Sequence, residues 1–191
     1  MALEHNDLFV LIQRSSRMRH RKKTYLESLL VKYGSYKTHI KLARKWGVEI
    51  GERCIVMNCD FGTEPYLVTI GNHCLIGPGV QFVTHDAGIW VFKEDHTTPT
   101  TKFGPIIVHD NCVIGIRSII MPDVEIGPNS VVGAGSVVAR DVPPNTVYAG
   151  NPVKYVESYD EYLEKSKLKD TGPIENGRTK EQQLIQRFKN K

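Results

Sequence analysis

The stretch from Ile114 to Pro143, "IGIRSIIMPDVEIGPNSVVGAGSVVARDVP", divides into consecutive blocks of six residues. An aliphatic residue opens each block, and a small or β-branched residue follows four places later. The first places hold Ile114, Ile120, Ile126, Val132 and Val138, and the fifth places hold Ser118, Val124, Ser130, Ser136 and Val142. Blocks in the same register begin earlier, at Ile50, Ile70, Ile76 and Val108. Because a repeated unit places the same positions in one core, two positions of each block are expected to point inward.

A strict period of six fits neither the 3.6-residue period of a helix nor the two-residue alternation of a single strand. It fits a chain that winds in coils of three short strands joined by tight turns, with six residues for each flat face. Glycine follows the inward aliphatic residue at positions 51, 71, 77, 115, 127 and 133, where a turn needs backbone freedom or close approach. The repeat therefore predicts an all-β solenoid.

The repeat, together with its ending "VVGAGSVVARDVPPNTVYAGNPVK" (residues 131–154), resembles the hexapeptide-repeat acyltransferases. Within that family the chain is most similar to sugar and polysaccharide O-acetyltransferases, the relatives of the maltose and galactoside enzymes. The resemblance covers about residues 46–155, and the segment "ARKWGVEIGERC" (43–54) is similar to the start of polysaccharide-modifying members. It implies a left-handed parallel β-helix, a homotrimer and acetyl-CoA as the acyl donor.

The chain is expected to consist of a helical cap, the β-helix and a C-terminal helix with a tail, at residues 1–47, 48–155 and 156–191. The segment "YKTHIKLARKWG" (36–47) ends in a glycine, as helices often do. The end coil of a solenoid must be covered, and an amphipathic helix would cover it. The C-terminal segment "YVESYDEYLEKSKLK" (155–169) has the pattern of a charged helix.

Composition allows one folded unit and excludes little else. The 191 residues carry a net charge of +4, and the excess is concentrated in a basic run from Arg14 to Lys23. No fold or aromatic pattern typical of nucleic-acid binding accompanies this run, so capping or plain solvation is preferred to nucleic-acid or peripheral membrane contact. No apolar run approaches the roughly 20 residues that span a bilayer, and a cytoplasmic protein is expected.

The four cysteines lack the CxxC spacing of zinc sites, and neither disulfides nor a metal site is expected. Cys54, Cys74 and Cys112 occupy the fifth place of their blocks, like Ser130, so they are interpreted as small core residues. Cys59 does not fit the count. β-Helical carbonic anhydrases share the repeat but need three zinc-binding histidines, and no H-x₄-H pair occurs here.

The repeat is interrupted between Val83 and Pro105 by "VTHDAGIWVFKEDHTTPTTKFGP", whose composition is that of an exposed loop at residues 84–105. His85 lies at the root of this loop, directly after a strand. Acyl transfer to a hydroxyl needs a base that is neutral near pH 7, and histidine meets that need. In the family that the chain resembles, a histidine followed by a projecting loop is this base, so His85 is predicted to be catalytic. Its orienting partner is left open between Asp86 and a backbone carbonyl.

The resemblance also implies the binding residues. Contacts with CoA are expected from Ile116, Ala134, Ala139, Arg140 and Lys154, with Arg140 and Lys154 on phosphate. The relatives often have Trp in a "DNxWIG" block followed by a small residue, whereas this chain has "DNCVIGIR" (110–117), so the side chain of Ile116 is expected to reshape the channel for the donor. The expected contacts with the acceptor are Asn58, Asp60 and Trp90. Trp90 belongs to the projecting loop at residues 84–105, which is called the arm below.

The leading hypothesis is an acetyl-CoA-dependent O-acetyltransferase that acts on a sugar hydroxyl of a bacterial surface polysaccharide or its precursor. N-acetylation of an amino sugar is the nearest alternative, because it would use the same base and donor site. An antibiotic acetyltransferase of the chloramphenicol or streptogramin type is another. A non-catalytic scaffold is disfavoured by the loop histidine and the intact ending of the repeat.

Overall fold

The computed structural model of the chain describes residues 25–92, 101–168 and 179–189. The basic run from Arg14 to Lys23 and half of the expected tail at residues 170–191 lie outside these residues. The described residues belong to two compact units, which divide between Tyr159 and Asp160. Within the described ranges, no helix combines the length and the apolar character needed to cross a membrane.

The described part of the first unit begins with two helices and continues with short strands. The helices are α2 (Tyr25–Tyr33) and α3 (Tyr36–Trp46), and two 3₁₀ helices follow, η1 (Pro65–Leu67) and η2 (Gly88–Phe92). The strands up to the arm are β1 (Glu49–Ile50), β2 (Ile55–Val56), β3 (Val68–Ile70), β4 (Leu75–Ile76), β5 (Gln81–Phe82), β6 (His85–Asp86) and β7 (Lys102–Phe103). The later strands are β8 (Ile106–Val108), β9 (Val113–Ile114), β10 (Ile119–Ile120), β11 (Val124–Ile126), β12 (Val131–Val132), β13 (Val137–Val138), β14 (Thr146–Ala149) and β15 (Lys154–Ser158). The helix α4 (Tyr159–Leu168) begins at the division, and α5 (Lys180–Lys189) belongs to the second unit.

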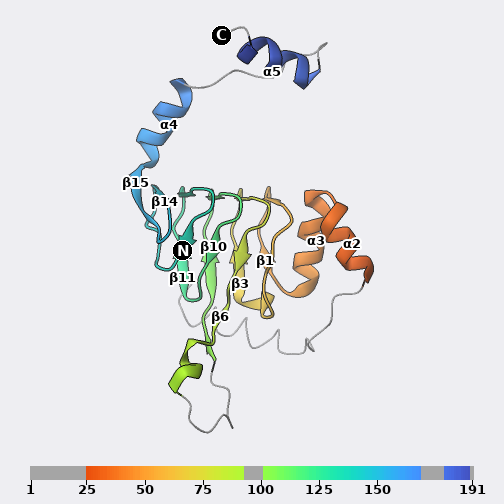
Figure 1. Cartoon of the computed structure of the whole chain (residues 1–191), viewed down its shortest axis with the longest axis vertical. Helices are drawn as coiled ribbons and strands as arrows, with labels where there is room; N and C mark the ends of the chain where they lie inside the picture. Colours follow the sequence, from red (N-terminus) through yellow and green to blue (C-terminus); the bar gives the residue numbers. More distant parts are fainter. Residues whose placement is uncertain (1–24, 93–100, 169–178, 190–191) are drawn as a thin grey trace. The chain divides into compact units, whose positions relative to one another are not determined.

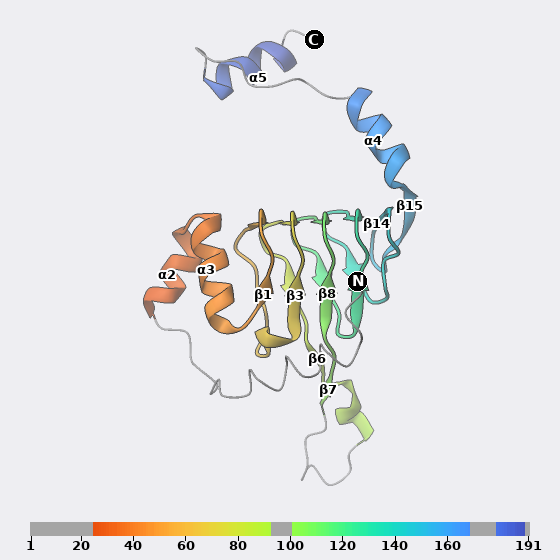
Figure 2. The same cartoon turned by 180° about the vertical axis from the view of Figure 1, so that it is seen from behind.

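Three sheets take their strands from the chain in rotation (Figures 1 and 2). The first sheet has the order β1-β3-β8-β11, the second β2-β4-β9-β12-β14-β15, and the third β5-β10-β13. Within these three sheets, all pairs are parallel except β14 with β15. One passage through the first, second and third sheets is called a coil below, so that coil 2 contains β3, β4 and β5. The expected winding of short parallel strands is thus present.

The core contains the positions that the six-residue count predicts. All ten first-place and fifth-place residues between Ile114 and Val142 are at most 2% exposed. The earlier first-place residues Ile70, Ile76 and Val108 are equally buried. Because every coil adds the same inward positions, the core is one continuous column of aliphatic and small side chains. The prediction of two inward positions per block is confirmed.

Close approach of neighbouring coils explains the glycines of the repeat. A Cβ atom on Gly77 would lie 2.8 Å from the backbone nitrogen of Ile116 in the next coil. Left-handed backbone occurs at other corner positions, including Asn111, Asn129 and Asn145, with φ between 56° and 60°. The side-chain amides of these three asparagines form a ladder, in which Asn111 Nδ2 donates to Asn129 Oδ1 at 2.7 Å and Asn129 Nδ2 donates to Asn145 Oδ1 at 2.8 Å. Asparagine tolerates this conformation, so the ladder fixes one corner of the coils.

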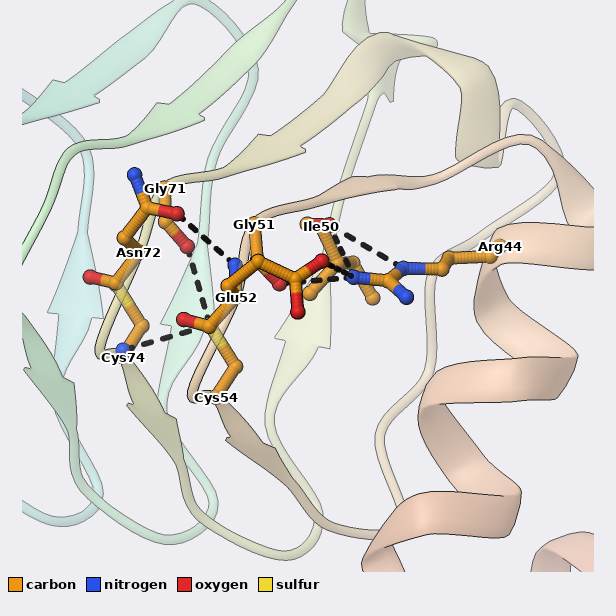
Figure 3. A network of polar contacts seen from close by, with 8 residues as sticks. All are labelled: Arg44, Ile50, Gly51, Glu52, Cys54, Gly71, Asn72 and Cys74. Atoms are coloured by element: carbon orange, nitrogen blue, oxygen red, sulfur yellow. Dashed lines mark hydrogen bonds and ion pairs between the residues drawn. The ribbon is translucent and has the colours of Figure 1, made fainter.

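The helix α3 covers the open edge of coil 1. Ser35 caps its N-terminus through a bond from the Thr38 N–H, and Gly47, with φ of 107°, ends it as the sequence predicts. The guanidinium of Arg44 reaches the first coil, where Nη2 donates to Ile50 O at 2.7 Å and to Gly51 O at 2.9 Å (Figure 3). An exposed sheet edge would otherwise present such unpaired carbonyls to solvent.

The thiols stabilise the stacking of coils by hydrogen bonds. Cys54 Sγ donates to Gly71 O at 3.1 Å, and Cys74 Sγ donates to His109 O at 3.1 Å (Figure 3 shows the first pair). Cys112 Sγ donates to Gly127 O at 3.0 Å, and in the next coil Ser130 Oγ donates to Pro143 O at 2.9 Å. At the corner before the second sheet, the fifth place therefore holds a residue that is small and also a donor, which explains why Ser130 follows three cysteines there.

Cys59 belongs to the repeat although the count of six does not place it. It is buried, and its neighbour Asp60 pairs with Gln81 of β5, so Cys59 is equivalent to Val80 of coil 2. Three steps separate the buried Val56 from Cys59, whereas four separate Ile76 from Val80. The corner of coil 1 is one residue shorter than that of coil 2, and for this reason the count of six does not place Cys59. Burial raises the pKa of the Cys59 thiol to about 12.

Candidate active site

The arm leaves the coils at the end of coil 2. Val83 is still bonded into the third sheet, since its N–H donates to Ile120 O at 2.8 Å. The next residues form β6, which pairs in antiparallel fashion with the returning β7, and His85 lies opposite Phe103. Gly104 closes the root of the arm, because its N–H donates to Thr84 O at 3.0 Å. His85 is therefore attached to the third sheet by a short, hydrogen-bonded connection.

A buried carboxylate lies beside His85. The Nδ1 atom of His85 is 3.0 Å from Oε2 of Glu64, a residue of coil 1. Thr84 Oγ1 donates to the same oxygen at 2.7 Å, and Thr63 Oγ1 donates to the other oxygen, Oε1, at 2.7 Å. Glu64 is only 8% exposed. Its carboxylate is thus held in place by three polar partners.

The hydrogen bonds decide the charge of Glu64. Burial by itself raises the pKa of this carboxyl, but the bonds from Thr63, Thr84 and His85 and the charge of His85 together outweigh burial and leave the pKa below its usual value. Glu64 is therefore ionised at neutral pH, and an ionised carboxylate can only accept. The proton of neutral His85 must then be on Nδ1, and Nε2 is left as the base.

The sequence left the orienting partner of His85 open between Asp86 and a backbone carbonyl, whereas in the structure the partner of Nδ1 is the side chain of Glu64. Asp86 Oδ1 instead accepts the backbone N–H of Gly88 at 2.7 Å and stabilises the turn that leads into η2. In the antiparallel pair, Asp86 lies opposite Lys102, one residue along from His85. Successive side chains of a strand point to opposite faces, so Asp86 is directed away from the imidazole face.

Packing between coils 1 and 2 places Glu64 next to Thr84 and His85 at the root of the arm. The ring of Phe61 stacks on that of Phe82 at a centroid distance of 5.0 Å and an interplanar angle of 8°. Both rings are buried, and Asp60 pairs with Gln81 beside them. These contacts fix residues 60–64 against β5, and Glu64 precedes the 3₁₀ helix η1 that begins with Pro65. Glu64 and His85 are far apart in the sequence and become neighbours only because coil 2 stacks on coil 1. The sequence alone therefore does not indicate this pair.

Four of the five expected donor contacts lie at the two corners that bound the third sheet, one before and one after its strands, and these corners are called its edges below. Ile116 and Ala134 lie at the corner before β10 and β13, where both are exposed. Ala139 and Arg140 lie at the corner after β13, which is also the corner from which His85 leaves in coil 2. Lys154 is exposed at the start of β15, opposite Ala149. A single chain thus brings His85 to the same edge as Ala139 and Arg140, with Ile116 and Ala134 on the other edge.

The expected acceptor contacts lie in coil 1 and in the arm. Asn58 and Asp60 are exposed residues of coil 1, and Asp60 Oδ1 accepts the N–H of Gly62 at 3.1 Å. Trp90 belongs to η2 and is 48% exposed. Among the residues that the structure describes, no group of three or more His, Cys, Asp or Glu side chains is placed to hold a metal ion.

The sequence of this chain is similar to proteins with hexapeptide repeats, which agrees with the six-residue count. The model of the bacterial transferase hexapeptide family (six repeats) matches residues 105–140. Protein CapG of Staphylococcus aureus is 43% identical over 122 residues, a match that covers 62% of this chain and 70% of CapG. This chain belongs to the hexapeptide-repeat transferase family. The hexapeptide-repeat region of the chain includes the corners at Ile116, Ala134 and Ala139.

Other members of the hexapeptide-repeat family are acetyltransferases by name. Galactoside O-acetyltransferase of Escherichia coli is 33% identical over 129 residues, and the match covers 68% of this chain but 59% of that enzyme. The crystal structure of the hexapeptide-repeat acetyltransferase VCA0836 from Vibrio cholerae has a TM-score of 0.59 at 26% identity, and covers 83% of this chain and 94% of that one. The same protein in complex with acetyl-CoA has a TM-score of 0.56 at 26% identity, over 83% and 90% of the two chains.

Proposed function

We propose that the chain is an acetyl-CoA-dependent O-acetyltransferase that acts on a sugar hydroxyl of a bacterial surface polysaccharide or its precursor. One observation carries the proposal: His85 is fixed at the root of the arm by the buried Glu64, with Nε2 free of that contact. Family membership and the galactoside O-acetyltransferase relative support acetyl transfer to a sugar. The segment "ARKWGVEIGERC" supports a polysaccharide acceptor.

The base acts on the acceptor hydroxyl. Nε2 of His85 takes the proton as the hydroxyl oxygen attacks the carbonyl carbon of the thioester, and a C–O bond forms. The tetrahedral intermediate then expels the CoA thiolate, which receives the proton from the imidazolium. Glu64 stays ionised throughout and stabilises the imidazolium, as a carboxylate partner of a catalytic histidine does. General-base catalysis of this kind typically contributes about 10²- to 10⁴-fold.

The donor would bind along the third sheet. Arg140 and Lys154 are exposed cations suited to its phosphates, and the corners at Ile116, Ala134 and Ala139 offer backbone amides for the pantetheine arm. To contact one donor, the corner with Ile116 and Ala134 and the corner with Ala139 and Arg140 must face each other across a groove. Two copies of the chain, side by side, would supply one edge each, which supports a homotrimer with its active sites between subunits.

The second sheet supplies a surface for such an assembly. Its outward positions in coils 1 to 3 are Ile55, Leu75 and Val113, which are 38–41% exposed and lie next to one another in register. An outward row of aliphatic side chains is typical of an interface. The left hand of the β-helix and the division into residues 1–47, 48–155 and 156–191 are part of the proposal and rest on the family resemblance.

N-acetylation of an amino sugar is the second candidate. It would use the same base and donor site, because an amine attacks a thioester as a hydroxyl does. The exposed Asn58, Asp60 and Trp90 would contact either acceptor.

The test is CoA release by the purified protein with acetyl-CoA and a panel of sugars, amino sugars and chloramphenicol. We expect turnover with sugars, and an alkali-labile ester in the product. An alkali-stable amide would establish N-acetylation instead. Failure to bind acetyl-CoA in calorimetry would overturn both and favour a scaffold.

A further inference from the structure

An aromatic side chain shares the face of the arm on which His85 lies. His85 and Phe103 are directly opposite in the antiparallel pair of β6 and β7 (labelled in Figure 2). Residues opposite each other in such a pair project to the same side, and the next pair, Asp86 with Lys102, projects to the other. The two rings are 5.9 Å apart between centroids, at an angle of 53°. Phe103 is nevertheless 55% exposed, so the residue has surface available for another contact.

The position of Phe103 along the coils sets it on the donor side of His85. The strand β6 continues from coil 2, whereas β7 leads through Gly104 into β8 of coil 3. Gly104 is bonded to Thr84 on one side and packs on the other against Asp123, where a Cβ atom would meet the backbone N of Asp123 at 2.5 Å. The expected donor contacts lie in coils 3 and 4 and in β15, and the expected contacts of coil 1, Asn58 and Asp60, lie beyond His85 in the opposite direction.

The geometry of the reaction then identifies what meets the ring. The attacking oxygen must be within hydrogen-bond reach of Nε2 and about 3–3.5 Å from the thioester carbonyl carbon. The carbonyl carbon therefore lies within a few ångströms of the imidazole, on the side from which the donor enters. The acyl chain is the part of the donor attached to this carbon on the side away from sulfur. An exposed ring beside the imidazole borders the space around the carbonyl carbon, from which this chain extends.

We propose that Phe103 forms one side of the acyl pocket and limits the length of the acyl group that the protein transfers. The inference rests on the proposed function and deepens it, since it assigns the selection of a short acyl group to one residue. The phenyl ring packs on the acetyl methyl group and occupies the volume that the further methylenes of a longer chain would need. A smaller side chain opens that volume, and each methylene that becomes buried there stabilises the bound donor through the hydrophobic effect.

The test compares acetyl-CoA, butyryl-CoA and hexanoyl-CoA with wild-type protein and with Phe103→Ala, by calorimetric binding and by CoA release. Wild-type protein is expected to prefer acetyl-CoA in both measurements. Phe103→Ala is expected to shift the butyryl-to-acetyl ratio about tenfold or more toward butyryl. Phe103→Tyr keeps the ring and is expected to keep the wild-type ratio.

Val91→Ala is the matched control, because Val91 is an exposed apolar residue of the same arm at a different place. It is expected to leave the ratio unchanged, and sedimentation and circular dichroism of each variant check assembly and folding. An unchanged ratio in folded Phe103→Ala overturns the inference. So does an increase confined to the KM of the sugar acceptor, because that result would assign the ring to acceptor stacking. Wild-type protein without acyl-CoA binding or turnover would overturn the proposed function itself.

Discussion

At the scale of residues, the proposed chemistry depends on the pair of His85 and Glu64. A histidine alone at the root of a loop could rotate and exchange tautomers. The buried carboxylate, bonded also to Thr63 and Thr84, removes that freedom by accepting the Nδ1 proton. The imidazole is then presented with Nε2 as the acceptor of a proton, which is the state that a general base needs.

Replacement of Glu64 by Gln tests this positioning role. We expect kcat of Glu64→Gln to fall on the order of 10²-fold, because the amide no longer stabilises the imidazolium and can donate to Nδ1 in place of accepting. The Kd for acetyl-CoA, measured by calorimetry, is expected to stay unchanged. Glu64→Asp keeps the charge and is expected to recover part of kcat. A loss of donor affinity equal to the loss of kcat would indicate a structural role instead.

The lowered pKa of Glu64 also predicts how stability depends on pH. The carboxyl has a lower pKa in the folded state than its usual value of 4.5, so the folded state binds fewer protons. Its contribution to stability is complete above about pH 4.5 and is lost as the pH falls through the folded pKa. The difference in the free energy of unfolding between wild-type protein and Glu64→Gln, from urea denaturation, is expected to shrink between pH 6 and pH 3.5. A difference that is constant or grows on acidification contradicts the assignment.

At the scale of elements, the corners of the coils impose most of the sequence pattern. Each corner of the second sheet requires a small donor at the fifth place, and each close approach requires glycine. Cys112→Ser is expected to change the free energy of unfolding by less than about 1 kcal/mol, because Ser130 makes the same bond one coil later. Cys112→Leu is expected to cost about 1–3 kcal/mol through overpacking of a fully buried site. Equal stability of the two variants in urea would contradict the account.

The sequence predicts the repeated elements well and their departures poorly. Periodicity alone identifies the buried residues at the first and fifth places from Ile114 to Val142, because each block directs the same two positions into the core. Cys59 escapes the count because one corner is a residue shorter. The role proposed for Glu64 could not be predicted, because its contact with His85 depends on how coil 2 stacks on coil 1. The segment that contains Glu64 also follows no period. His85 could be found from the sequence since it lies where the period fails, directly after a regular strand.

At the scale of the whole molecule, the edges of the third sheet separate the residues that a donor would contact. Ile116 and Ala134 lie on one edge, and His85, Ala139 and Arg140 lie on the other. Under the proposed function, a single chain would therefore offer two half sites. The proposed homotrimer is the arrangement that joins them, and the outward row of Ile55, Leu75 and Val113 is the surface proposed to hold it together.

A charge placed in this row tests the assembly. Leu75→Glu is expected to convert trimers to monomers in sedimentation velocity, because a carboxylate cannot be buried unpaired between aliphatic side chains without a large desolvation cost. Loss of acetyl transfer is expected to accompany the change, while Thr69→Lys, at the outward position of the neighbouring first sheet, is the control and should stay trimeric. Monomeric wild-type protein with full activity would contradict the proposal of shared sites.

The central claim is that His85 removes the acceptor proton, and single-turnover acetyl transfer by His85→Ala tests it most directly. The wild-type protein and the variant are mixed with acetyl-CoA at a saturating concentration of the best acceptor from the sugar panel, and CoA release is followed in time. The rate of the variant is expected to be about 10²- to 10⁴-fold lower, with an unchanged Kd for acetyl-CoA. A rate within a few-fold of the wild-type rate would contradict the account.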